Sequence, residues 1–292
     1  MNAHTHGHDP GDRRVLWAVV VNVGLTVAQI AGGILSGSLA LIADAIHNLS
    51  DAISLGIAFA ARKIARRPGH AGMTFGYGRA EIVAALVNYT TLIVIGLWLV
   101  NEAIWRFIEP QGVDGWLVVG IAVIALIVDW VTALLTYRLS KHSVNIRAAF
   151  LHNVADALGS IGVIIAGSVI ILFGWTVIDP IITLVIAGYI LWQSFKEGRD
   201  VVRMLMLGTP IDIDRDALRE DLCRIDGIED VHHMHVWEIE ERRRSLEAHL
   251  VIGDAYWATA QQVKRSVRDV LKERYSIEHS TLELERVDET CN

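Results

Sequence analysis

The chain has 292 residues, of which 52% are hydrophobic and 20% are charged, and its formal net charge is −7. The apolar residues are concentrated in the first two-thirds of the chain and the negative charge in the last third, which excludes an evenly soluble protein and gives no indication of a nucleic-acid partner. The two cysteines lie far apart in the sequence, so a disulfide framework and a paired-cysteine metal motif are excluded as well.

Six apolar segments follow one another from the N-terminus. A helix needs roughly 20 apolar residues to cross the hydrocarbon core of a bilayer. The segments that are long enough are 15–35, 39–61, 80–107, 115–139, 148–173 and 177–195. We therefore predict a leader over residues 1–14, which carries His4, His6 and His8, and a six-helix transmembrane domain over residues 15–206.

Basic residues are distributed unevenly between the connections of these segments. The connections after the second, fourth and sixth segments carry lysines and arginines, and Arg13 and Arg14 precede the first segment. The connections SGS, EPQGVDG and FGWTVIDP on the other side contain none. Because lysine and arginine near the ends of transmembrane helices favour the cytoplasmic side, we expect a multi-pass protein of the cell (inner) membrane with both termini in the cytoplasm.

Residues 207–292 are more polar and are expected to form a separate cytoplasmic domain. A helical run, DIDRDALREDLCRI, precedes the alternating stretches VHHMHVWEIE and LEAHLVI, and a second helical run and a last alternating stretch, STLELERV, follow. The order αββαβ predicts two helices on one face of a three-stranded sheet. The predicted fold class is thus an α-helical membrane protein with a C-terminal α+β domain.

Charged side chains interrupt two of the apolar segments in a repeated pattern. Asp44, His47 and Asp51 in the second segment fall within an arc of roughly 60° on a helix. In the fifth segment His152 and Asp156 repeat the four-residue spacing, and HNLSDA agrees with HNVADA at four of six positions. With both termini on one side, the two copies run antiparallel, as expected for an inverted repeat of three helices.

Two imidazoles and two carboxylates make a four-coordinate set that suits Zn²⁺. We therefore predict a tetrahedral site near the middle of the membrane from His47, Asp51, His152 and Asp156. Asp44 is expected either to hold His47 in one tautomer or to accept a proton in a water-filled opening. Single polar residues such as Gln29 and Asp129 are more typical of hydrogen bonds between helices.

These motifs, with SGSLALIADAIHNLSD at 36–51, FGYGRAE at 75–81 and the αββαβ tail, closely resemble the cation diffusion facilitator family in its bacterial zinc-exporter branch. The resemblance covers about residue 13 to residue 287. It implies a homodimeric secondary transporter, not an enzyme, that moves Zn²⁺, and often Cd²⁺ or Co²⁺, out of the cytoplasm in exchange for H⁺. The transport site that it implies consists of His47, Asp51, His152 and Asp156.

The resemblance implies two further metal sites less clearly. In the loop after the second segment only His70 remains, and Tyr77 stands where a histidine can stand, so that site is expected to be absent or weak. The cytoplasmic domain resembles a ferredoxin-like, metallochaperone-like dimerisation module that holds zinc between protomers. Its expected ligands are His235, His249 and Glu285, then Glu283, with His232, His233 and His279 as further candidates and metal-free surface histidines as the alternative.

The expected mechanism is alternating access, in which helices rock around a fixed site in the membrane. Zinc binding needs neutral imidazoles and ionised carboxylates, so it expels protons from the site. A membrane metalloenzyme is the first rival, but the chain has neither an HExxH nor a GxSxG motif. The second rival is a non-transporting zinc-binding sensor or scaffold protein.

Overall fold

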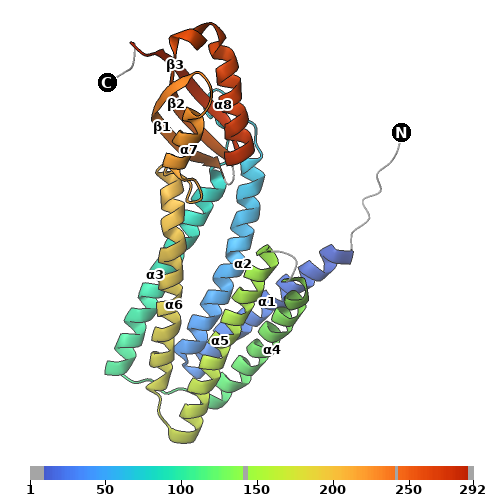
Figure 1. Ribbon diagram of the computed structural model, residues 1–292. Helices are drawn as coiled ribbons and strands as arrows, with labels where there is room; N and C mark the ends of the chain where they lie inside the picture. The colour runs from blue at the N-terminus through green and yellow to red at the C-terminus, as the bar shows by residue number, and fades with distance from the viewer. Residues whose placement is uncertain (1–9, 141–143, 241–242, 289–292) are drawn as a thin grey trace, which may run out of the picture. The chain divides into compact units, whose positions relative to one another are not determined.

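The computed structural model describes residues 10–140, 144–240 and 243–288, without the side chains of 10–22, 55, 58 and 135–152. The leader histidines His4, His6 and His8 therefore lie outside the described residues. Six long helices come first along the chain (Figure 1). They are α1 (Pro10–Ser36), α2 (Leu39–Ala65), α3 (Ala80–Ile108), α4 (Gly115–Ser140), α5 (Val144–Phe173) and α6 (Ile178–Leu205).

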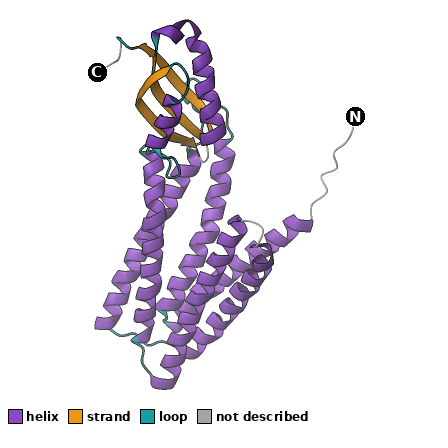
Figure 2. Cartoon of the chain, in the orientation of Figure 1, coloured by secondary structure: helices purple, strands orange, loops and turns teal. Residues whose placement is uncertain are grey.

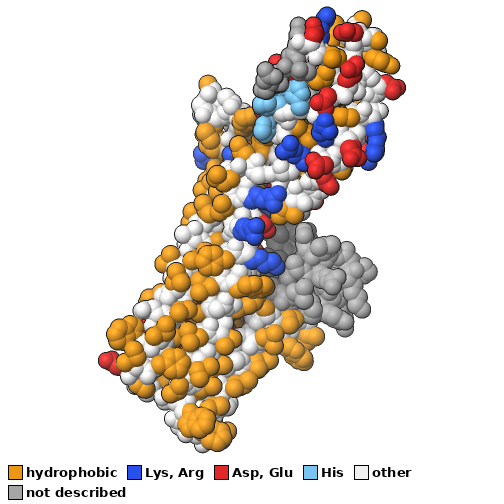
Figure 3. Space-filling model, turned by 60° about the vertical axis from the view of Figure 1, so that its left-hand side comes forward, with side chains coloured by type: hydrophobic (Ala, Val, Ile, Leu, Met, Phe, Trp, Pro, Cys, Tyr) orange, Lys and Arg blue, Asp and Glu red, His pale blue; other side chains and the backbone are white. Residues whose placement is uncertain are grey.

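Four stretches of the described chain are long and apolar enough to cross a bilayer: Ala80–Ile108, Gly115–Leu134, Asn153–Phe173 and Ile178–Leu205. The described side chains of α1 give the shorter apolar stretch Val23–Ser36. Helix α2 is as long as the others but carries Asp44, His47 and Asp51 in its first half. Figure 3 shows hydrophobic side chains spread over the surface of the long helices, which is the surface that a bilayer requires.

The chain divides into two compact units. The first, here called the helical unit, comprises Met1–Gly56 and Asn88–Phe195, and the second, the mixed unit, comprises Ile57–Val87 and Lys196–Asn292. In the helical unit α4 and α5 pack closely because Gly167 has no side chain. A Cβ atom there would lie 2.7 Å from the Val119 side chain and 3.1 Å from the Gly115 carbonyl oxygen.

The mixed unit contains every described strand of the chain (Figure 2). Its elements are α7 (Arg215–Cys223), β1 (Ile228–Glu240), β2 (Arg243–Ile252), a short 3-10 helix (Asp254–Thr259), α8 (Ala260–Tyr275) and β3 (Ile277–Arg286). The strand order is β1-β2-β3, with β1 antiparallel and β3 parallel to the central strand. The predicted αββαβ order and the α+β class are confirmed.

Alternation along β2 assigns the two faces of this sheet. Leu246, Ala248 and Leu250 are buried in one apolar core with side chains of α7 and α8, so these residues face the helices. Glu247 and His249 lie between them in the sequence and therefore point to the opposite, open face. The histidines and glutamates expected to bind metal can meet on that open face.

The loop between α2 and α3 packs on the sheet within the mixed unit. Arg79 Nε donates a hydrogen bond to the carbonyl oxygen of Ile239 (3.4 Å), and the rings of Phe75 and His279 meet edge to face with centroids 6.1 Å apart. A Cβ atom at Gly78 would lie 2.0 Å from Glu240 Oε2. The FGYGRAE motif therefore contacts two strands of the sheet.

An aspartate of α7 ties this helix to α8. The Tyr275 hydroxyl donates to Asp221 Oδ2 (2.6 Å), and Arg274 and Arg224 lie 2.7 and 3.1 Å from the same carboxylate. The hydrogen bond from Tyr275, with help from the arginines, holds the pKa of Asp221 below its usual value. Burial, and then the bond to Asp221, raises the pKa of Tyr275 to about 12.

Acid should therefore weaken this connection, and the Tyr275→Phe substitution should make it more sensitive to acid. Because the folded-state pKa of Asp221 is below the unfolded value of about 3.9, its stabilisation is complete above that pH and is lost as the pH falls through the folded-state pKa. Removing the Tyr275 hydroxyl should raise the pKa of Asp221. As the pH is lowered, hydrogen exchange of the α7 amides should therefore begin to speed up at a higher pH in Tyr275→Phe than in the unchanged chain. The exposed Tyr256, changed to Phe, is the control, and identical acid profiles for Tyr275→Phe and the unchanged chain would contradict this prediction.

Candidate metal centres

Three metal-binding side chains of the helical unit meet in one place. His47 and Asp51 lie one turn apart on α2, and Asp156 comes from α5. The Nε2 atom of His47 lies 3.3 Å from Asp156 Oδ1 and 3.9 Å from Asp51 Oδ2, and the three donor atoms lie within 4.8 Å of one another. In a tetrahedral zinc site with bonds of about 2.1 Å the donor atoms are about 3.4 Å apart, so small movements let this set close on one dication.

The surroundings of this group favour a bound cation. His47 is buried, and the side chains of Asp156 and Asp51 are 11% and 36% exposed. An aspartate at the centre of a bilayer costs at least about 2.5 kcal/mol, so two of them on facing helices need compensation. A dication would balance both carboxylates and would receive a nitrogen ligand from the neutral imidazole.

His152 is the fourth expected ligand of this site. It lies in the part of α5 whose side chains are outside the described residues, so its ligation stays a prediction. Its place one turn before Asp156 on a described helix is consistent with a contribution to the same face.

Tyr189 of α6 lies against the site and was not found from the sequence. Its ring meets the His47 imidazole edge to face, with centroids 6.1 Å apart. A tyrosine in a transmembrane segment carries no distinguishing sequence signal, because tyrosines are common near membrane interfaces. Tyr189 restricts the orientations open to the imidazole.

Asp44 stands outside the three-donor group of described residues and belongs to a neighbouring chain of hydrogen bonds. Gln29 Nε2 of α1 donates to Asp44 Oδ2 (2.7 Å), and Asn48 Nδ2 donates to Gln29 Oε1 (3.3 Å). The Ser160 hydroxyl lies 3.0 Å from Asp129 Oδ2 and 3.5 Å from Asp44 Oδ2. All five side chains are buried, so the network joins α1, α2, α4 and α5 beside the metal-binding group.

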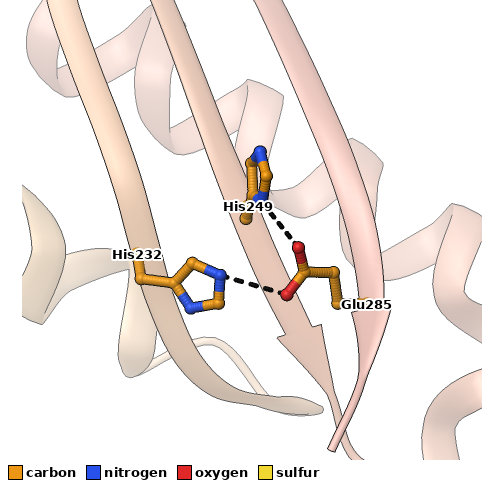
Figure 4. A group of neighbouring side chains, drawn as sticks. All are labelled: His232, His249 and Glu285. Atoms are coloured by element: carbon orange, nitrogen blue, oxygen red, sulfur yellow. Dashed lines mark hydrogen bonds and ion pairs between the residues drawn. The ribbon is translucent and has the colours of Figure 1, made fainter. Parts of the chain in front are cut away.

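The second group of metal-binding side chains lies on the open face of the sheet. Figure 4 shows Glu285 between two histidines: His232 Nε2 is 3.0 Å from one carboxylate oxygen and His249 Nδ1 is 2.5 Å from the other. On the other side of the imidazole, His249 Nε2 lies 3.3 Å from Glu283 Oε2. These residues come from three adjacent strands, because His232 pairs with His249 and His249 pairs with Glu283 in the register of the sheet.

A β-bulge determines which histidines of β1 reach this face. The register shifts between His232 and His235, and His233 has a positive φ of 49°. Val231 and Met234 are both buried in the core, so the two histidines between them project to the open face together. The ring of His233 stacks on His249 with centroids 4.9 Å apart.

The other candidate histidines lie at different distances from this group. The His235 ring is 5.3 Å from that of His233, and His235 pairs with Glu247, so His232 rather than His235 joins His249 and Glu285. His279 contacts Phe75 through its ring. Strict alternation along β1 would place His233 and His235 on one face of the sheet and His232 on the other. The bulge that brings His232 to the open face could not be predicted, because no glycine or proline marks its position in the sequence.

Both ring nitrogens of His70 already have hydrogen-bond partners. The backbone N–H of Gly72 donates to Nδ1 (3.1 Å), so Nε2 carries the hydrogen and lies 2.9 Å from the Tyr77 hydroxyl. Among the described residues, His70 belongs to neither group of three metal-binding side chains. A metal ion at His70 would have to displace one of these bonds.

Comparisons with known proteins cover nearly the whole chain. Residues 15–206 match the cation efflux transmembrane domain, and residues 210–287 match the cation efflux protein cytoplasmic domain. The zinc transporter ZitB of Escherichia coli is 37% identical over 290 residues, which cover 97% of this chain and 91% of the relative.

The names of two further relatives refer to a wider range of metals than zinc. The cadmium, cobalt and zinc/H(+)-K(+) antiporter of Bacillus subtilis is 34% identical, covering 97% of this chain and 91% of the relative. The metal cation efflux system protein CzcD of Cupriavidus metallidurans is 32% identical, covering 97% and 89%. With both domains matched along their length, the chain belongs to the cation diffusion facilitator family, in its zinc-exporter branch.

Proposed function

We propose that this transporter exports Zn²⁺ from the cytoplasm in exchange for H⁺, with Cd²⁺ and Co²⁺ as further substrates. Metal efflux itself follows from the family, and the names of the relatives supply the candidate metals and the antiport. The observation that carries the finer proposal is the convergence of His47, Asp51 and Asp156 from α2 and α5. His152 completes the proposed tetrahedral site, and alternating access exposes it to either side.

Competition between zinc and protons at this site is the proposed source of coupling. Zinc requires a neutral His47, so a proton and the metal ion compete for the same imidazole nitrogen. Protons that arrive from the outer side therefore favour release of the metal. Asp44 is proposed to stand on the proton pathway, because Gln29 and Ser160 hold its carboxylate beside the site.

The cytoplasmic domain is proposed to bind a regulatory Zn²⁺ and to form the homodimer contact. The match to the cytoplasmic dimer domain supports the homodimer, and the nitrogen and oxygen donors of His232, His249 and Glu285 suit zinc. His233, His235 and Glu283 lie beside them as further donors. Bound zinc would supply positive charge that offsets the two glutamates on this face.

The order of the domains and the positions of the two termini follow from the distribution of apolar and basic residues. The leader 1–14, the transport domain 15–206 and the cytoplasmic domain 207–292 are proposed to follow one another, with both termini in the cytoplasm of a cell with an inner membrane. Cysteine labelling from the two sides of sealed vesicles tests this arrangement.

Purified protein in liposomes tests the function directly. A zinc dye and a pH dye inside the vesicles should report opposite movements of Zn²⁺ and H⁺ that depend on one another. Zinc binding without any flux would instead support a non-transporting sensor or scaffold protein. Zinc flux that does not respond to a pH gradient would contradict the proton exchange.

The cytoplasmic site gives a separate prediction for Glu285. The Glu285→Gln substitution removes the charge between His232 and His249, so zinc affinity at this site should fall by more than about tenfold. Zinc titration of the full chain carrying Asp51→Ala and Asp156→Ala isolates this site from the proposed transport site. Glu278, which is exposed on the same strand, provides the control Glu278→Gln, and equal zinc affinity in the two variants would exclude Glu285 as a ligand.

A further inference from the structure

One buried carboxylate joins several turns at one end of the helical unit. Asp179, near the start of α6, is completely inaccessible to solvent. The turn between α1 and α2 and the end of α3 lie against it. Figure 1 shows the end of α3 and the start of α6 at the foot of the helices.

Asp179 satisfies the backbone at the start of α2. The first N–H groups of a helix have no partner inside it. Leu39 N donates to Asp179 Oδ2 (2.8 Å), and Ala40 N donates to Asp179 Oδ1 (3.4 Å). Leu41 N donates to the Ser38 hydroxyl (3.1 Å), which itself donates to Asp179 Oδ1 (2.5 Å). The cap of α2 is therefore shared between a local serine and an aspartate 140 positions away.

Arg106 of α3 holds the same carboxylate from another side. Its Nη1 atom lies 3.6 Å from Asp179 Oδ2 and also donates to the carbonyl oxygen of Gly37. Gly37 has a φ of 72°, and a Cβ atom there would lie 2.5 Å from the Gly112 carbonyl oxygen. Asp114 N, in the loop between α3 and α4, donates to Ser36 O (2.8 Å). The start of α2 is thus fixed against α3, α6 and this loop.

The position of this helix end determines where the proposed zinc ligands lie. His47 follows Leu39 by eight residues, about 12 Å along the axis, and both lie in the uninterrupted helix α2. A shift or rotation at the start of α2 therefore moves His47 and Asp51 relative to Asp156 on α5. The negative charge of Asp179 also complements the positive end of the helix dipole, which favours this position.

We propose that Asp179 is a positioning residue for metal transport: with Ser38 and Arg106 it fixes the start of α2, and thereby the distance between the zinc ligands of α2 and the ligand of α5. This inference rests on the proposed transport site. It assigns to the D-P sequence at 179–180 a role that acts on zinc through α2.

The test compares Asp179→Asn with Asp179→Glu in the full chain in liposomes. Asp179→Asn keeps the size of the side chain but loses the charge and one acceptor for the N–H groups of α2. The KM for zinc should rise about tenfold, the change expected for the loss of one charge-assisted hydrogen bond, with a smaller effect on turnover. Asp179→Glu keeps the charge and should recover part of the affinity. Ser38→Ala, which removes one donor to Asp179, should raise the KM by about threefold.

Asp214, which caps a helix of the mixed unit, provides a matched control. Its Oδ1 atom accepts hydrogen bonds from Asp216 N and Ala217 N at the start of α7, which carries none of the expected ligands. Asp214→Asn should leave the KM for zinc within about twofold of the unchanged chain. If Asp179→Asn is folded and its KM stays equally close, the positioning role is overturned, whereas absence of flux in the unchanged chain would overturn the proposed function instead. If Asp179→Asn does not fold, an unchanged KM in Ser38→Ala overturns the positioning role.

Discussion

Replacing Asp156 with alanine should reduce zinc flux at least about 100-fold. Asp156 is the one described carboxylate of α5 that lies beside His47, and the substitution leaves the α2 residues without their partner across the helix interface. Loss of a residue that only orients a ligand typically costs 10-fold to 100-fold in metal affinity, so loss of a direct ligand should cost at least as much. Zinc uptake into everted vesicles, normalised to the amount of folded protein, measures the effect.

The control for this substitution is an aspartate with no expected role in transport. Asp200 of α6 is exposed, and Asp200→Ala should leave the flux unchanged within the error of the assay. Gel filtration of both variants should give the same elution as the unchanged chain. Flux that survives in Asp156→Ala would place the transport site elsewhere in the helical unit.

The sequence was sufficient to predict the fold class because its patterns are local. Apolar length predicts the long helices, and alternation predicts the strands of the mixed unit, so the order αββαβ could be found without any tertiary information. The repeated H-x-x-x-D spacing likewise places His47 and Asp51 on one face of α2. The meeting of these residues with Asp156 required the further inference that the two halves are inverted repeats, and the geometry agrees with it.

Features that depend on contacts between distant segments could not be predicted. His232 reaches Glu285 because a bulge near His233 breaks the alternation of β1, and a bulge follows from the packing of the whole sheet. Asp179 caps a helix that begins 140 positions earlier, so no window of sequence contains both partners. The edge contact of Tyr189 with His47 depends in the same way on the packing of α6 against α2.

The buried polar residues of the helical unit divide into two kinds with different requirements. Gln29, Ser160 and Asp44 satisfy one another by hydrogen bonds across helix interfaces, so this part of the network needs no metal ion to be stable. His47 and Asp156 offer donor atoms at a separation that fits a tetrahedral metal site. Substitutions in the hydrogen-bonded network should therefore affect stability and proton coupling more than metal preference. Substitutions of His47 or Asp156 should change metal preference directly.

The His47→Asp substitution should change which metal the transporter prefers. It replaces the one described nitrogen donor of the site with an oxygen donor, and a site with three carboxylates suits harder cations better than zinc. Zinc affinity should fall by about tenfold or more, while affinity for Mn²⁺ is retained or increased.

Competition assays with Zn²⁺, Cd²⁺ and Mn²⁺ in liposomes measure this change as ratios of KM, which do not depend on the amount of active protein. The control is His70→Asp, because His70 lies in a loop and contacts Tyr77 rather than either metal-binding group. An unchanged order of metal preference in His47→Asp would mean that His47 does not bind the transported ion. A changed order of metal preference in His47→Asp, together with normal flux in His70→Asp, would assign selectivity to the imidazole of His47. The His47→Asp chain and the unchanged chain differ at the transport site in the type of this one ligand.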